Sequence, residues 1–124
     1  MPFTFEKLDV YQKSLKFIED IEKLTQGLKG KISFSLLDQL QRAAISISLN
    51  IAEGNGRFHK KNKINFFYIS RGSIFECVPI LHVLKSRNKI SDTEYDELYS
   101  KLEILSKMIS GLINSIEKKP LKLR

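Results

Sequence analysis

The sequence predicts an all-α protein folded as an antiparallel, up-down-up-down four-helix bundle. In four long segments the apolar residues recur every three or four positions, which is the period of one helix face. Short polar or glycine-containing stretches separate the segments and favour antiparallel neighbours. No stretch alternates apolar and polar residues as a half-buried strand would. The chain has 124 residues, a common size for one domain, so we expect a single domain over 1–124 with a lead at 1–7 and a basic tail at 118–124.

The first predicted helix covers residues 8–28 and follows a short extended lead that carries Phe3 and Phe5. Gly27 and Gly30 mark its end, because glycine is the usual residue just past a helix terminus. Its predicted core face comprises Leu8, Tyr11, Leu15, Ile18, Ile21, Leu24 and Leu28, and Val10 and Phe17 broaden it.

The second predicted helix, 35–53, has more apolar residues than one buried face requires. Ser35 and Asp38 have the spacing of a capping box, and the Gly-Asn-Gly stretch 54–56 should stop the helix. At about 100° per residue, an arc roughly 120° wide holds Leu36, Leu37, Leu40, Ala43, Ala44, Ile47 and Ile51. A narrower stripe on nearly the opposite side consists of Ile45, Leu49 and Ala52. Two apolar faces predict two neighbours, the helix's own bundle and another subunit.

The third predicted helix spans 61–86 and contains Pro79. We expect a kink between residues 75 and 79 rather than a break, because the apolar period continues beyond the proline. The fourth helix opens at 91–94, where Ser91 and Thr93 are both suited to be the cap. Its core face steps by three and four through Tyr95, Leu98, Leu102, Leu105, Ile109, Leu112 and Ile116.

Composition narrows the class of protein. The formal net charge is +7, with 21 lysines and arginines against 14 acidic residues, which favours contact with a polyanion. The one cysteine, Cys77, lies in an apolar run and is expected in the core. The start of the chain lacks the features of a secretory signal, and no apolar run is long enough to cross a membrane. We therefore expect a reduced, cytoplasmic setting.

The topology of the bundle gathers cations at one pole. In an up-down bundle, the second connection and both chain ends lie at the same end. The residues predicted to contact nucleic acid there are Arg57, Lys60, Lys61, Lys63, Lys118, Lys119, Lys122 and Arg124. A smaller group at the opposite pole comprises Lys29, Lys31, Lys85, Arg87 and Lys89, with acidic residues among them. A solvated basic surface without any ligand is the equal alternative.

The sequence offers little for catalysis. Carboxylate-type metal sites in bundles need Glu-x-x-His spacing, whereas Glu76 and His82 are six positions apart, which places them on different faces of the helix. Neither histidine is placed for a catalytic pair, so we expect no enzyme activity, metal or cofactor. Arg42 and Glu76 should lie level on the second and third helices. We expect them to form a structural ion pair that orients the bundle.

Three segments resemble the motifs of a known family, the 23S rRNA intervening-sequence proteins, also called four helix bundle proteins. Residues 39–54, QLQRAAISISLNIAEG, resemble the family signature QxxRAAxSIPxNIAEG. Residues 8–12, LDVYQ, resemble its LxVWQ, and residues 66–73, FFYISRGS, with Glu76 resemble its FLxIAxGSxxE. The chain departs from the pattern at Ser48, Tyr11 and Ser70, which replace proline, tryptophan and alanine, and Pro79 is an addition. Ser48 should leave the second helix straighter.

The resemblance implies a bundle that assembles into a ring, typically a homopentamer. Some bacterial genes of the family lie within insertions in 23S rRNA genes. A related branch, the accessory variability determinants of diversity-generating retroelements, consists of basic pentamers that bind nucleic acid and a reverse transcriptase. In this chain, Ile45, Leu49 and Ala52 are the candidate oligomer-interface residues.

Three functional hypotheses follow. The first is a non-enzymatic, homo-oligomeric accessory protein that binds RNA or DNA through the basic pole. The second is a protein-interaction scaffold that docks a partner, such as a reverse transcriptase, without binding nucleic acid. The third is a small helical ribonuclease. It is the weakest hypothesis, because helical bundle nucleases often carry an Arg-x4-His motif or a near variant, and neither His59 nor His82 has an arginine at that spacing.

Overall fold

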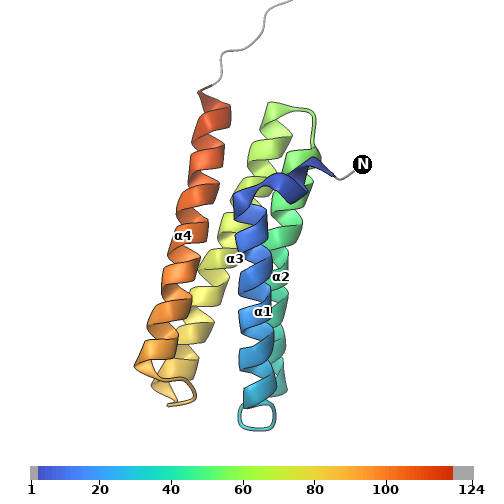
Figure 1. Cartoon of the computed structure of the whole chain (residues 1–124). Coiled ribbons are helices and arrows are strands. Elements are labelled where there is room, and N and C mark those ends of the chain that lie inside the picture. Colours follow the sequence, from blue (N-terminus) through green and yellow to red (C-terminus); the bar gives the residue numbers. More distant parts are fainter. Residues whose placement is uncertain (1–2, 119–124) are drawn as a thin grey trace, which may run out of the picture.

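The computed structural model describes residues 3–118, which form a short 3-10 helix and four α-helices. The elements are η1 (Thr4–Lys7), α1 (Asp9–Leu28), α2 (Phe34–Gly56), α3 (Lys60–Ser86) and α4 (Asp92–Glu117). Successive long helices run in opposite directions and pack side by side along their lengths (Figure 1). The predicted all-α bundle is therefore confirmed, while the lead forms a helical turn instead of an extended segment. Within residues 3–118, no helix combines the length and apolar character needed to cross a membrane.

The core face of α4 follows the predicted period over most of its length. Tyr95, Leu98, Leu102, Leu105 and Ile109 are all buried. Near the C-terminus the buried position moves to Ile113, and Leu112 and Ile116 are only half-buried. A strict three-four repeat averages 3.5 residues per turn, so on a helix with about 3.6 it drifts away from the core.

The core face of α1 differs from the prediction. The deepest positions are Val10, Ser14, Phe17, Ile21 and Thr25, whereas Leu8, Tyr11, Leu15, Ile18 and Leu24 are half-buried. The two hydroxyl residues are tolerated inside because each donates to a carbonyl of its own helix. Ser14 Oγ lies 2.6 Å from Tyr11 O, and Thr25 Oγ1 lies 3.0 Å from Ile21 O. The sequence pattern counted only apolar residues, so it missed both of these core positions.

The helix α2 begins within one residue of the predicted start, but its predicted cap and its predicted end are wrong. Ser33, not Ser35, is the N-cap, and its Oγ accepts a hydrogen bond from Leu36 N at 3.3 Å. The helix also continues through Gly54 to Gly56 instead of stopping at residue 53. In α4, Ser91 is the cap and forms a reciprocal capping box with Glu94. As predicted, α3 continues unbroken through Pro79.

The most extensive contact in the bundle is between α2 and α3. Gly54 lies in a tight part of this contact, since a Cβ added there would lie 2.7 Å from the ring of Phe67 and 3.1 Å from Lys63 O. Further along, Ser73 Oγ donates to Ser46 Oγ at 2.8 Å, and the buried Ser70 Oγ donates to Ile47 O at 2.8 Å. Small and hydroxyl-bearing residues thus bring the two backbones together.

The lead, the α2–α3 turn and the end of α4 meet at one pole, as predicted (Figure 1). Thr4 Oγ1 lies 2.8 Å from Asn55 Oδ1, which joins the lead to the turn. Lys60 Nζ donates to Glu117 O at 3.2 Å, which joins the turn to α4. We call this end of the molecule the basic pole.

The close approach at Gly54 leads to a stability prediction. Gly54→Ala should lower the free energy of unfolding by about 1–3 kcal/mol, because the new methyl group must displace Phe67 or backbone atoms. Urea unfolding followed by circular dichroism measures the change.

Gly56→Ala is the matched control, because a Cβ there meets nothing within 4 Å. It should leave stability unchanged or raise it by up to about 1 kcal/mol. Equal stability of Gly54→Ala and wild type would contradict the close approach.

A basic pole as candidate nucleic-acid interface

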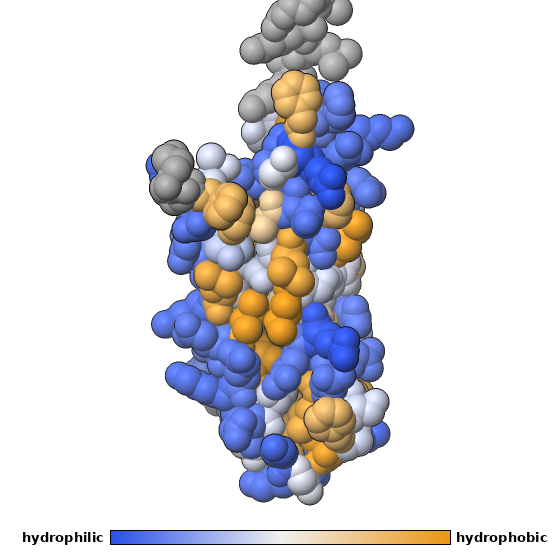
Figure 2. Space-filling model, turned by 90° about the vertical axis from the view of Figure 1, so that its right-hand side faces the viewer, coloured by the Kyte–Doolittle hydropathy of each residue, from blue (hydrophilic) through white to orange (hydrophobic). Residues whose placement is uncertain are grey.

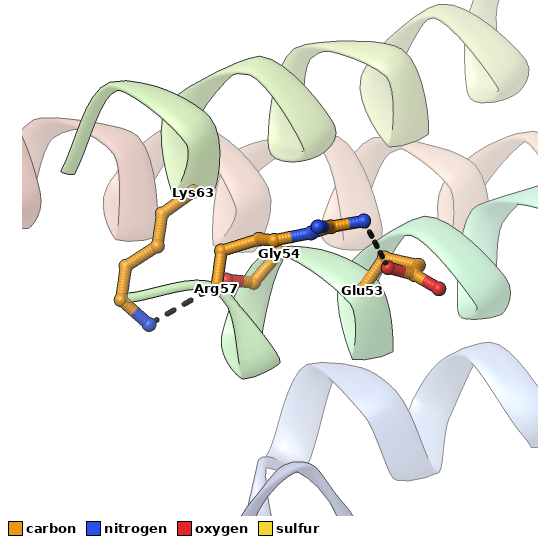
Figure 3. A network of polar contacts seen from close by, with 4 residues as sticks. All are labelled: Glu53, Gly54, Arg57 and Lys63. Carbon is orange, nitrogen blue, oxygen red and sulfur yellow. Dashed lines mark hydrogen bonds and ion pairs between the residues drawn. The ribbon is translucent and has the colours of Figure 1, made fainter. Parts of the chain in front are cut away.

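Arg57 begins the α2–α3 turn and is held by two contacts. Its Nη2 lies 2.9 Å from Glu53 Oε2, one helical turn earlier (Figure 3). Its guanidinium lies 4.6 Å from the centre of the Phe66 ring. Both side chains of the ion pair are about half exposed, so solvent screens the pair and its contribution to stability is small. The guanidinium therefore has a defined position while still facing solvent.

Lys60 and Lys63 carry structural contacts that the sequence did not reveal. Lys63 is half-buried, and its Nζ donates to Asn55 O at 2.8 Å. It also donates to Gly54 O at 3.5 Å (Figure 3). Lys60 donates to Glu117 O at the end of α4. An ammonium group is favourable at both places, because the carbonyl end of a helix carries partial negative charge. These two cations help to build the pole as well as to charge it.

The other predicted cations differ in what the structure shows of them. Lys61 lies in the first turn of α3 and Lys118 follows α4, and both are exposed. The remaining members of the predicted set, Lys119, Lys122 and Arg124, lie outside the described residues. Five of the eight predicted cations can thus be placed, and all five lie at the basic pole.

Sequence reasoning missed the most exposed large apolar side chain at this pole. Phe58 has 91% of its surface accessible, and its ring meets the His59 ring edge-on with centres 5.3 Å apart. The signal was available, because a single aromatic residue stands between Arg57 and a run of basic residues. Exposed aromatic rings among cations are typical of surfaces that stack on nucleic-acid bases.

The predicted ion pair between Arg42 and Glu76 does not form. Arg42 Nε binds Asp38 Oδ2 on its own helix at 2.8 Å, its side chain is 79% exposed, and Glu76 is exposed on α3. Arg42 and Glu76 do lie at nearly the same height along the bundle, as expected. Ser46 and Ser73, which are about one helical turn from Arg42 and Glu76 respectively, are in contact. The two side chains nevertheless point to solvent, and an (i, i+4) partner is within easier reach than one on another helix.

The described part of the chain offers no evident metal site or reactive thiol. Within residues 3–118, no three or more histidine, cysteine or acidic side chains are grouped to hold a metal ion. Cys77 is a core residue, as predicted, with none of its surface exposed. Burial, with a smaller effect of Glu76, raises the pKa of its thiol to about 12, which disfavours the nucleophilic thiolate.

The second apolar stripe of α2 is at the surface. Ile45 and Leu49 are 41% and 59% exposed, and Ala52 is half-buried, whereas the opposite arc of α2 lies in the core. Figure 2 shows apolar residues along the middle of the long face where α2 runs. The expectation that this stripe is less buried than the core-facing arc is confirmed. Such an exposed strip is typical of a contact surface.

These features define a class: a small four-helix bundle with a cationic pole and an apolar strip along one side. The family model described as 23S rRNA-intervening sequence protein matches residues 6–111. The chain belongs to that family. A crystal structure of a protein with unknown function from the S23 ribosomal protein family of Bacteroides thetaiotaomicron VPI-5482 has the same fold, with a TM-score of 0.80 at 25% identity. The match covers 84% of this chain and 97% of that one. No curated protein matches the sequence.

Burial of Cys77 leads to a second prediction. At about pH 8.5, a thiol reagent should label the native protein at least about 100-fold more slowly than protein in concentrated guanidinium chloride.

Because the folded-state pKa of Cys77 is about 12 and the ordinary value is 9.0, the free energy of unfolding should also fall as pH rises from 9 towards 12. A Cys77→Ala variant lacks this component of the pH dependence and serves as the control. Rapid labelling without denaturant would contradict a closed core.

Proposed function

We propose that this protein is a non-enzymatic, homo-oligomeric, cytoplasmic accessory protein that binds nucleic acid at its basic pole. The observation that carries the proposal is the convergence of cations from separate parts of the chain. Arg57 comes from the α2–α3 connection, Lys60 and Lys61 come from the first turn of α3, and Lys118 follows α4, far away in sequence. Phosphates are the partners that such a cluster attracts without reading sequence.

The charge balance at this pole supports phosphate binding. Glu53 is paired with Arg57, and Glu6 accepts a hydrogen bond from Phe3 N within the lead. Together with the exposed Glu117 at the end of α4, these acids offset the cations only in part, in a chain whose net charge is +7. The fixed Arg57 guanidinium and the exposed Lys61 would make the first contacts, and counterion release would supply much of the affinity.

Self-association would multiply those contacts. The exposed strip with Ile45 and Leu49 would be covered by another subunit, and a ring would then present one basic pole per subunit. Several weak sites on one particle bind a long polymer far more strongly than one site does. A pentamer is the expected ring, on the resemblance of the sequence motifs to the family.

A protein-interaction scaffold is the second candidate, and the same apolar strip favours it. Leu49 and Ala52 line a shallow depression together with Phe5 and Arg57, which offers both apolar and charged contacts to a protein such as a reverse transcriptase. A defined protein partner recovered free of nucleic acid would favour this function. A ribonuclease is the weakest candidate, and RNA cleavage that is lost in His59→Ala would support it.

The basic pole predicts the effect of removing two exposed cations. Lys61→Gln with Lys118→Gln should weaken binding to RNA or DNA and reduce the slope of log K against log salt by about 1.4–1.8, the loss of two phosphate contacts. Fluorescence anisotropy across a salt series measures both quantities.

The matched control is Lys29→Gln with Lys31→Gln at the α1–α2 turn, which removes the same charge from the opposite pole. Its binding should stay close to wild type. Equal losses in both double variants would show that only net charge matters. Absence of binding at low salt would overturn the proposal.

The apolar strip predicts a separable effect on assembly. Ile45→Glu should dissociate the oligomer while helix content stays near wild type, because a charge cannot be buried unpaired at a subunit contact. Light scattering gives the mass, and circular dichroism gives the helix content.

Ile104→Glu is the matched control, because Ile104 is 48% exposed but lies on α4, away from the strip. It should leave the assembly intact. If Ile45→Glu instead unfolds the subunit, the strip is part of the core.

A further inference from the structure

Phe58 is exposed in a way that folding does not explain. The ring leaves 91% of its surface in water and contacts only one other aromatic ring, that of its neighbour His59, within residues 3–118. Burying an aromatic ring is among the larger favourable contributions to folding, and this position makes almost no use of it. The ring also stands in the middle of the proposed nucleic-acid surface, directly after Arg57 and close to Lys60 and Lys61.

A depression of about 350 Å³ lies beside this ring. Its apolar lining comes from the buried Phe67 and the half-buried Leu112 and Ile116, which belong to α3 and α4. Lys60 and Lys63 line it as cations, and Asn55 and Ser115 add an amide and a hydroxyl. The volume falls at the lower end of the range of about 300–1,000 Å³ that small-molecule sites occupy.

The combination matches the chemistry of one unpaired nucleobase. A base has two flat apolar faces, polar edges and a phosphate attached through its sugar. The Phe58 ring offers a stacking face, the apolar lining offers a second one, and the amide and hydroxyl groups suit the polar edge. Ammonium groups beside the depression suit the phosphate. A base held in a duplex cannot enter, because its faces are already stacked and its edge is already paired.

We propose that the basic pole binds single-stranded nucleic acid in preference to duplex, and that one unpaired base stacks on Phe58 and enters the depression beside it. This inference rests on the proposed function, since it assigns a ligand form to the same surface. The cations supply affinity for any strand, whereas Phe58 supplies the preference for unpaired bases.

The absence of tryptophan from the chain makes a direct test available. Phe58→Trp introduces the single tryptophan of the protein, so its fluorescence reports on position 58 alone. Addition of a short single-stranded RNA, or DNA of the same sequence, should quench and shift this emission, while a blunt duplex should not. Phe34→Trp is the matched control, because Phe34 is 76% exposed but lies at the start of α2, at the other pole. Its emission should not respond.

Removal of the ring should separate single strands from duplexes. Phe58→Ala should bind single strands about 5- to 150-fold more weakly than wild type, which is the range for loss of one stacked base. Its affinity for duplex should be unchanged, because the phosphate contacts remain. Since the side chain is so exposed, the variant should melt at the wild-type temperature.

An abasic strand of the same length identifies the source of the effect. Wild-type protein should bind it as weakly as Phe58→Ala binds the intact strand. If Phe58→Ala and wild type bind intact strands equally, the base site is wrong while nucleic-acid binding stands. If the basic-pole variants also leave binding unaffected, or if no strand binds, the proposed function fails too. Quenching of Phe58→Trp by a protein partner alone would assign the ring to protein contact and overturn the inference.

Discussion

The close packing of α2 against α3 is the contact on which the rest of the structure depends. At Gly54 the space between the helices is taken by the Phe67 ring, so no side chain fits there. Two hydroxyl contacts, Ser73 with Ser46 and Ser70 with Ile47 O, fix the relative height of the helices further along. This packing fixes the two helix ends that the turn must join. The turn carries Arg57 and Phe58, and Lys60, Lys61 and Lys63 follow at the start of α3, so the basic pole is built on this packing.

The family signature therefore describes an interface between helices more than a reactive site. Gly54 admits Phe67, Ser46 meets Ser73, and Asn50 Nδ2 donates to Ser46 O at 2.8 Å and to Ser46 Oγ at 3.0 Å. Of the charged signature residues, Arg42 forms only a local pair with Asp38, and Glu53 orients Arg57. Membership of the family is consequently informative about the fold. Residues that bind a partner are expected elsewhere, on the surface that this packing exposes.

The same cationic side chains make structural contacts at the basic pole and form its proposed phosphate-binding surface. Lys60 and Lys63 donate to carbonyls in the last turns of α4 and α2, where partial negative charge gathers, and so connect the start of α3 to both helix ends. Arg57 is oriented by Glu53 and the Phe66 ring. These contacts lower the conformational entropy that the side chains would lose on binding a phosphate, which favours a preorganised surface. Phe58, by contrast, is left in water within residues 3–118, and the base stacking proposed above would account for its exposure.

The sequence by itself determined the helices, their order and the pole at which the cations gather. Those features follow from local periodicity, caps and connection length, all of which act between residues close in sequence. It also identified Ile45 and Leu49 as a second, less buried face. Only the tertiary structure decided that Ser14 and Thr25 lie in the core, that α2 extends to Gly56, and that Arg42 turns away from Glu76. Each of these outcomes depends on which hydrogen-bond partners and neighbouring segments surround the residue in the folded chain, and periodicity does not give that information. Exposure of Phe58 was decided in the same way, because no other element of residues 3–118 packs over the turn that carries it.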